Sequence, residues 1–276
     1  MIKVENVSFK YKNSDSRVLD ELNFSIREGE IVAIVGENGS GKSTIGRLIS
    51  GITKLKEGNI IIDDFDISNA KNYKLIQEKV GIVFQNPENQ IIFNNIYDEL
   101  SFSLKNLEKN EIEKRIDSAL EQVGMLKLKN HDLYSLSLGQ KQRIMIAEVL
   151  AKKPKYIIFD EPTTMIDSEG KEKIYEIIKN LKKQGYTIIC ITNLADEILL
   201  ADRTLILSDG KIAYEIEKKD LIDKVYILKK FGIKEPTLLD ILTKLKDNGI
   251  ILNLQDFSID ELVNALKGKI INEKCN

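Results

Sequence analysis

The chain has 276 residues, 42% of them hydrophobic, which is enough to build one large domain or a large and a small one. Its 41 basic and 43 acidic residues give a formal net charge of -2, so no global field attracts it to nucleic acid or to an anionic membrane. The apolar runs fall short of the roughly 20 residues that span a bilayer, so any membrane crossing must come from partner chains.

Short β-branched strands separated by turns are predicted in the first 84 residues. They are Ile2–Phe9, Leu22–Ile26, Ile31–Val35, Asn59–Ile62 and Val80–Phe84. Met1 leads directly into the first strand with no apolar segment before it, so we expect no secretory signal.

A phosphate-binding loop is predicted between the strand Ile31–Val35 and a helix over Thr44–Ser50, because the residues between them fit G-x-x-x-x-G-K-[ST]. A glycine-rich loop at a helix start can point its backbone N–H groups at phosphate oxygens. We expect Lys42 to reach the β- and γ-phosphates of a nucleotide and Ser43 to ligate Mg²⁺. The predicted nucleotide-binding residues here are Gly36, Glu37, Asn38, Gly39, Ser40, Gly41, Lys42, Ser43 and Thr44.

Residues from about 86 to 152 are predicted to be helical. Apolar residues from Ile112 to Val123 recur at helical spacing, and Gly124 is placed to end that helix. The single histidine, His131, lies in this region and is interpreted as a surface or structural residue.

Strands return after residue 155 and alternate with helical pattern, which favours a parallel sheet with helices packed on it. The strands are Tyr156–Asp160, Thr187–Thr192, Thr204–Leu207 and Lys211–Ile216, and an amphipathic helix from Ile174 to Leu181, followed by Gly185, separates the first two. Asp160 and Glu161 end the first of them. After a phosphate loop, such a pair suits Mg²⁺ binding by Asp160 and polarisation of the attacking water by Glu161.

The chain after residue 217 is predicted to form short helices. Leu238, Ile241, Leu242 and Leu245 repeat at helical spacing, and Ser258–Glu261 fits a capping box. So short a tail is expected to pack on the main domain or on a partner. Cys190 and Cys275 indicate neither a disulfide framework nor a metal cluster, and this usage suits a reducing cytosol.

The segment Leu136–Arg143, placed between the phosphate loop and Asp160-Glu161, resembles the signature of the ATP-binding-cassette (ABC) ATPases. The resemblance implies an α/β P-loop NTPase fold with a RecA-like core, an antiparallel β subdomain and a helical signature subdomain over about residues 86–152. Residues 1–217 would form this ATPase domain. A helix start with a small hydroxyl residue suits a γ-phosphate, and the family implies that Ser137, Gly139 and Gln140 bind the phosphate held by the opposite subunit.

The same resemblance assigns three further residues. Tyr11 matches the aromatic residue that stacks on adenine, although a strand aromatic buried in a core is the alternative. Gln85 matches the glutamine that contacts Mg²⁺ and the attacking water and links the nucleotide to the helical subdomain. Asp167 matches the aspartate that faces the other subunit.

Two segments, Gln85–Gln90 and Phe231–Pro236, look like those of the ATPase subunits of energy-coupling-factor importers. This likeness implies an ATPase that uses ATP and Mg²⁺ to drive uptake of a vitamin or of a transition-metal ion such as cobalt or nickel. Two such ATPases, often different, dock under a transmembrane coupling protein, and a separate membrane protein binds the substrate. The chain would be peripheral at the cytoplasmic face of the cell membrane, would contact no nucleic acid, and would pair through a small helical C-terminal domain, residues 218–276.

The sequence departs from the family at two positions. Asn193 stands where a histidine usually contacts the γ-phosphate, and a neutral amide forms a weaker hydrogen bond than a charged group. Leu138 replaces the first of two signature glycines, which let the backbone approach phosphate. In a heterodimer the two departures fall in different ATP sites. We therefore predict a second, histidine-bearing ATPase partner and slow turnover at this chain's own site, while the retained Glu161 argues against a dead enzyme.

Three alternatives remain open at this stage. A soluble cassette ATPase acting on ribosomes or DNA usually has two cassettes, a long coiled-coil insertion or a basic surface. A regulatory subunit that binds ATP without hydrolysing it is favoured by Asn193 and Leu138 but opposed by Glu161. A small-molecule kinase would leave the segment Leu136–Arg143 unexplained.

Overall fold

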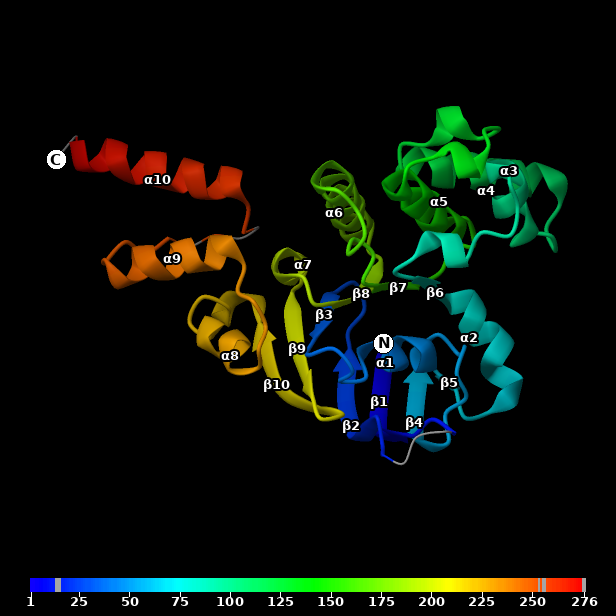
Figure 1. Ribbon diagram of the computed structural model, residues 1–276, viewed down its shortest axis with the longest axis horizontal. Helices are drawn as coiled ribbons and strands as arrows, with labels where there is room; N and C mark the ends of the chain where they lie inside the picture. The colour runs from blue at the N-terminus through cyan, green and yellow to red at the C-terminus, as the bar shows by residue number, and fades with distance from the viewer. Residues whose placement is uncertain (13–15, 253, 255–256, 275–276) are drawn as a thin grey trace.

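The computed structural model describes residues 1–12, 16–252, 254 and 257–274, with the side chains of the last helix up to Lys267. A six-stranded sheet with the order β10-β9-β3-β8-β7-β6 forms its centre (Figure 1). Its strands are β3 (Ile31–Val35), β6 (Val80–Val83), β7 (Tyr156–Asp160), β8 (Thr187–Thr192), β9 (Arg203–Ser208) and β10 (Lys211–Glu217). All neighbours are parallel except β9 and β10. The predicted parallel sheet is thus confirmed, with one antiparallel edge strand.

A second, antiparallel sheet has the order β2-β1-β4-β5. It consists of β1 (Ile2–Phe9), β2 (Leu19–Ile26), β4 (Glu57–Ile62) and β5 (Phe65–Asp66). Its buried face shares one hydrophobic cluster with helix α1 (Lys42–Ile49) and with residues of the central sheet such as Val32 and Ile158. The antiparallel β subdomain therefore holds α1, and the loop that precedes it, against the central sheet.

Helices cover the central sheet and extend beyond it (Figure 1). Helices α2 (Tyr73–Lys79), α6 (Ser168–Lys183) and α7 (Ala195–Leu200) belong to the core. Helices α3 (Ile96–Phe102), α4 (Lys109–Gln122) and α5 (Leu138–Ala151) form the helical subdomain between β6 and β7. Gly124 and Gly185 lie just beyond α4 and α6 with positive φ values of 67° and 88°, so the sequence identified both helix ends correctly.

The tail contains α8 (Val225–Lys230), α9 (Thr237–Asp247) and α10 (Ile259–Lys274). Apolar residues of the tail, including Leu228, Leu239 and Leu262, belong to the same core cluster as Ile188 of the central sheet. The tail is thus continuous with the core of the main domain, and whether it also packs on a partner stays a prediction. Ser258 accepts a hydrogen bond from the N–H of Glu261 (3.1 Å), as a cap of α10 should. The 3₁₀ turns of the chain are η1 (Ala70–Asn72), η2 (Pro87–Asn89), η3 (Leu126–Leu128), η4 (Leu133–Ser135) and η5 (Lys218–Asp220).

The structure corrects several predicted bounds. Strand β2 begins at Leu19 rather than Leu22, because an irregular register in β1 lets Phe9 pair with Leu19. Phe84 lies beyond β6, and α1 begins two residues before Thr44. The short helices α2 and α3 were not predicted, since seven residues carry too little periodicity.

Cys190 is buried and not in a disulfide, while Cys275 lies outside the described residues. Within the described part of the chain, every helix is too short or too polar to cross a bilayer.

Candidate nucleotide-binding site

The predicted phosphate loop connects β3 to α1. Gly41 is the N-cap residue of α1, with φ of 106° and no side-chain cap hydrogen bond. Because the first N–H groups of a helix have no partner within the helix, they are available to an anion there. Gly36 has to be glycine for a different reason, since a Cβ atom would lie 2.2 Å from the carbonyl oxygen of Leu207.

Lys42 is held inside this loop and is only 5% exposed. Its Nζ donates to the carbonyl oxygens of Gly36 (2.8 Å) and Glu37 (2.9 Å). Burial lowers the pKa of Lys42, and the nearby carboxylates of Glu161 and Asp160 offset part of that effect. An ammonium group has three N–H donors, so one remains for a phosphate oxygen. The buried Ser40 Oγ has no hydrogen-bond partner among the described residues, which also suits a ligand in the loop.

A pair of oxygen ligands lies beside the loop. Ser43 Oγ donates to Asp160 Oδ1 at 2.9 Å, across from α1 to the end of β7. Burial raises the pKa of Asp160, and the hydrogen bond from Ser43 lowers it in part. Hard oxygen donors of this kind fit Mg²⁺, which is usually bound through one or two carboxylates plus substrate phosphates. The described residues contain no cluster of three His, Cys, Asp or Glu side chains that could form a metal site without the nucleotide.

Glu161 and Asn193 follow the neighbouring strands β7 and β8. The N–H of Glu161 donates to the carbonyl oxygen of Ile191 (2.8 Å), and Glu161 has a φ of 52°, a conformation that non-glycine residues rarely adopt. Asn193 Nδ2 donates to Asn38 Oδ1 of the phosphate loop (2.5 Å) and lies 3.4 Å from Glu161 Oε1. The structure thus brings Glu161 and Asn193 together beside the phosphate loop. Backbone strain like that at Glu161 is typical of functional residues.

Tyr11 and Gln85 lie at the margins of this site. Tyr11 is 40% exposed and its hydroxyl forms a hydrogen bond with Thr44 Oγ1 (3.0 Å), so the alternative of a buried core aromatic is wrong. Its ring packs edge-on against Phe9, which leaves a face for stacking. Gln85 follows β6 at the same edge of the sheet as Asp160, and its side chain is exposed.

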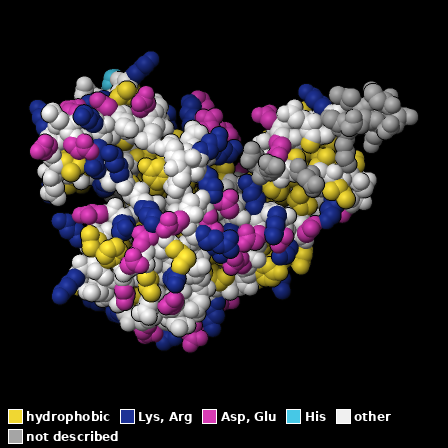
Figure 2. Space-filling model, turned by 180° about the vertical axis from the view of Figure 1, so that it is seen from behind, with side chains coloured by type: hydrophobic (Ala, Val, Ile, Leu, Met, Phe, Trp, Pro, Cys, Tyr) yellow, Lys and Arg dark blue, Asp and Glu magenta, His cyan; other side chains and the backbone are white. Residues whose placement is uncertain are grey.

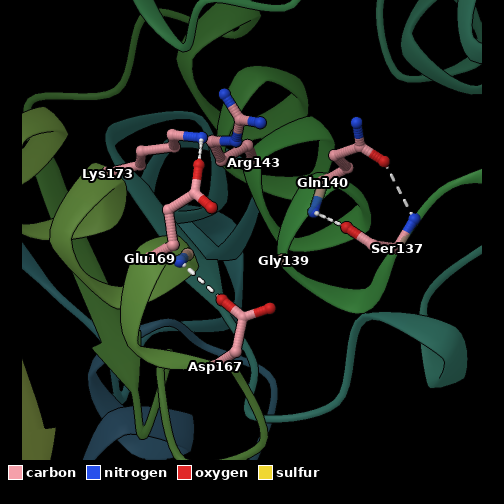
Figure 3. Close-up of a pocket in the computed structure, with 8 residues that line it drawn as sticks. Ser137, Gly139, Gln140, Arg143, Asp167, Glu169 and Lys173 are labelled. Carbon is pink, nitrogen blue, oxygen red and sulfur yellow. Dashed lines mark hydrogen bonds and ion pairs between the residues drawn. The ribbon is translucent and has the colours of Figure 1, made fainter.

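The signature segment forms a separate hollow (Figure 3). Ser137 is the N-cap of α5 and accepts from the N–H of Gln140 (3.3 Å), while Gln140 Oε1 accepts from the N–H of Ser137 (2.9 Å). Asp167 lies on the other wall of the hollow, where it caps α6 by accepting from the N–H of Gly170 (2.7 Å). None of the residues that line this hollow belongs to the phosphate loop. Ser137 and Lys42 therefore occupy different sites on one chain.

Two contacts that sequence reasoning missed connect α5 with the segment after β6. Gln142, fully buried, donates from Nε2 to the carbonyl oxygen of Phe84 (2.8 Å), and Lys141 Nζ forms an ion pair with Glu88 Oε1 (2.6 Å). No motif or periodicity predicts these two contacts, because the partners lie more than fifty positions apart in the chain. The capping box of Ser137 and Gln140, in contrast, is readable from S-x-x-Q.

Comparison with known proteins agrees with this geometry. Residues 19–164 match the family described as ABC transporter. The chain belongs to the ABC transporter family. As in that family generally, the expected activity is ATP hydrolysis with Mg²⁺. His131 is exposed and is not among the residues of the two sites described above.

The most similar relatives share nearly the whole length of the chain. It is 36% identical to the energy-coupling factor transporter ATP-binding protein EcfA1 of Clostridioides difficile, covering 96% of this chain and 98% of the relative. It is 40% identical to EcfA1 of Fusobacterium nucleatum, covering 95% and 97%. This ABC ATPase therefore resembles the energy-coupling-factor type over nearly its whole length, as the sequence predicted.

Solved structures of ABC proteins share the fold of this chain. The fold is similar to that of cbiO1 from Clostridium perfringens, described as part of the ABC transporter complex cbiONQ, with a TM-score of 0.75, 33% identity and coverage of 87% of this chain and 97% of that one. It is also similar to an ATP-binding cassette solved as a dimer with ADP and Pi, with a TM-score of 0.72, 31% identity and coverage of 79% and 99%. The predicted α/β P-loop fold is confirmed.

Proposed function

We propose that this ABC ATPase is the ATP-hydrolysing subunit of an energy-coupling-factor importer, which drives uptake of a vitamin or of a transition-metal ion such as cobalt or nickel. One observation carries the proposal. The chain has a phosphate loop with Asp160 and Glu161 in one place and a signature hollow with Ser137 in another. Each half-site is incomplete alone, so two ATPase subunits must face each other to enclose ATP.

The residues of the phosphate-loop half-site have distinct tasks in this mechanism. Lys42 and the N-terminal N–H groups of α1 hold the phosphates, and Tyr11 stacks on the adenine. Ser43, Asp160 and Gln85 would hold Mg²⁺, which would supply positive charge against the phosphates of ATP. Glu161 accepts a hydrogen bond from the attacking water and takes its proton, while Asn193 donates a neutral hydrogen bond nearby.

The signature half-site serves the other subunit. There the N–H groups of Gly139 and Gln140 and the hydroxyl of Ser137 would contact the γ-phosphate held by the facing ATPase. Leu138 at the first position of α5 weakens that contact, and Asn193 weakens the chain's own site. We infer a heterodimer with a histidine-bearing ATPase, because only then does each site carry one weakness.

The tail, residues 218–276, would help the subunits pair. Figure 2 shows hydrophobic side chains gathered on the C-terminal helices. Exposed apolar residues there include Tyr226, Ile241, Ile251, Ile259 and Val263, with Ile259 72% exposed. The assembly would sit at the cytoplasmic face of the membrane under a coupling protein and a substrate-binding membrane protein. No nucleic acid takes part.

The test measures ATP hydrolysis by the purified chain, alone and with its co-purified partner ATPase, for the wild type and for Asn193→His. A histidine that donates a charge-assisted hydrogen bond is expected to raise the chain's own turnover about fivefold, which corresponds to roughly 1 kcal/mol. The control is Asn180→His, at an exposed position of α6. Brisk wild-type turnover that Asn193→His leaves unchanged would contradict the proposal.

A second candidate function is a regulatory subunit that binds ATP and locks the dimer without hydrolysing it. Asn193 and Leu138 favour it. The same assay separates the two functions, because a regulatory subunit would show ATP-dependent pairing and no turnover in any variant that keeps Glu161.

A further inference from the structure

Glu197, in the first turn of α7, is a carboxyl group with no exposed surface. Thr163 Oγ1 donates a hydrogen bond to its Oε1 at 2.5 Å. Burial raises the pKa of Glu197, and the hydroxyls of Thr163 and Thr192 lower it in part. Both threonines are themselves completely buried. The hydrogen bond from Thr163 therefore joins the turn after β7 to α7, the helix that follows β8.

These two threonines neighbour the predicted hydrolytic residues. Thr163 follows Glu161 by two positions, and its carbonyl oxygen accepts from the N–H of Ile166 (3.1 Å). Thr192 directly precedes Asn193, and its Oγ1 accepts from the N–H of Leu194 (2.8 Å). The hydroxyl of Thr192 thus spans Asn193 to the backbone of Leu194, while Thr163 holds the segment that follows Glu161.

This arrangement costs stability. The second carboxyl oxygen of Glu197, Oε2, is buried and has no hydrogen-bond partner among the described residues. A buried carboxyl group with an unpaired oxygen carries a desolvation penalty, and an apolar side chain of similar volume at such a place is often neutral or stabilising. Stability alone therefore does not account for Glu197.

We propose that Glu197 is a positioning residue that ties the turn after β7 to the turn after β8, and so keeps Asn193 beside Glu161. The proposal rests on the proposed function, in which both residues act on the attacking water. The 3.4 Å separation of Asn193 Nδ2 and Glu161 Oε1 is the geometry that Glu197 maintains. Because Thr163 also anchors Ile166, the same carboxyl group reaches the segment that leads to Asp167.

The experiment compares Glu197→Leu with Glu197→Gln in the full chain assembled with its partner ATPase. Leucine removes the acceptor of the Thr163 hydrogen bond, and we expect kcat to fall about 10- to 100-fold, as for a misplacement of roughly 1 Å, with the KM for ATP unchanged. Glutamine keeps an acceptor oxygen, so it should restore kcat close to the wild type. The control is Asp196→Leu, which changes the exposed neighbouring carboxyl group.

Two further measurements test the inference if Glu197→Leu does not fold, and by a readout other than turnover. Thr163→Val breaks the same hydrogen bond from the other side and should reproduce the loss of kcat even where Glu197→Leu fails to fold. NMR can follow the side-chain amide resonances of Asn193, whose Nδ2 donates to Asn38 in the wild type. These resonances should shift in Glu197→Leu and in Thr163→Val but not in Asp196→Leu.

Unchanged kcat and unchanged Asn193 resonances in both variants would overturn the inference. Equal losses in Glu197→Gln and Glu197→Leu would do so as well, since they would indicate a role beyond the acceptor oxygen. A wild-type complex without ATP hydrolysis would contradict the proposed function instead, and the amide resonances would still decide whether Glu197 positions Asn193.

Discussion

Replacing Gln142 tests whether its buried amide fixes the segment after β6 to the signature helix α5. The side chain has no exposed surface, and Nε2 donates to the carbonyl oxygen of Phe84 at 2.8 Å. Phe84 directly precedes Gln85, and Gln142 belongs to α5, the helix that Ser137 caps. This hydrogen bond therefore helps to set the position of Gln85 relative to Ser137. Gln142→Met keeps the length of the side chain and removes the donor.

The magnitude follows from the groups left behind. Leaving the partly buried carbonyl oxygen of Phe84 without its donor costs about 1 to 3 kcal/mol. Methionine recovers part of this, because Gln142 Oε1 is itself buried with no partner in the described part of the chain. We expect Gln142→Met to lower the free energy of unfolding by about 1 to 2 kcal/mol. Gln142→Glu should cost more, because a carboxylate would face the Phe84 carbonyl oxygen in the interior.

Urea unfolding followed by circular dichroism checks this order, and ATP hydrolysis by the assembled ATPases checks the functional link. Both variants should lower kcat, whereas Gln184→Leu, at an exposed position after α6, should change neither quantity. If Gln142→Glu were as stable as the wild type, or more stable than Gln142→Met, the hydrogen bond to Phe84 would not be the stabilising contact and the reasoning would fail.

Two predictions concern ionic contacts outside the site. Arg203 is buried and forms ion pairs with Glu30 (2.8 Å) and Glu215 (2.7 Å). Arg203→Met should lower the free energy of unfolding by about 3 to 5 kcal/mol, because Glu30 would remain buried without an ion pair. The double variant Arg203→Met with Glu30→Gln should lose clearly less, and equal losses in urea unfolding would argue against the ion pair. Partial burial raises the pKa of Asp63, but hydrogen bonds from Tyr156, Lys155 and Lys79 outweigh it and hold that pKa below the ordinary value of 3.8. Because the pKa of Asp63 is lower in the folded state, its carboxylate stabilises the fold above pH 3.8, and this contribution is lost as the pH falls below that value. The free energy of unfolding measured on acidification should therefore decline less steeply for Asp63→Asn than for the wild type.

Local pattern was sufficient for much of the fold. The strands Ile31–Val35, Tyr156–Asp160 and Thr187–Thr192 have the predicted bounds, because continuous apolar runs with β-branched residues describe buried strands well. Ile2–Phe9 also has the predicted bounds, although polar residues interrupt its apolar ones. The phosphate loop, Asp160 and Glu161 were identified because their chemistry requires fixed residue types at short spacing. Their roles remain predictions of function that the variants above test.

Long-range contacts could not be predicted in this way. The pairing of Lys141 with Glu88 spans 53 positions, and Asn193 meets Asn38 across 155 positions. No periodicity or motif links such residues. The first pair depends on how α5 packs against the segment after β6, and the second on the pairing of β3 with β8 in the sheet. Glu197 gave no signal for the same reason, as an isolated glutamate in a short helix reads as a solvated residue.

The sequence by itself determined that this chain is an ABC ATPase, because a glycine-rich loop, a signature segment and an Asp-Glu pair are defined by residue identity and spacing along the chain. Only the tertiary structure decided that Ser137 lies in a hollow apart from Lys42, and that a buried carboxyl group joins the turns after β7 and β8. The physical reason is that local order follows from neighbouring residues, whereas distances between distant residues follow from the packing of the sheet and the helices on it.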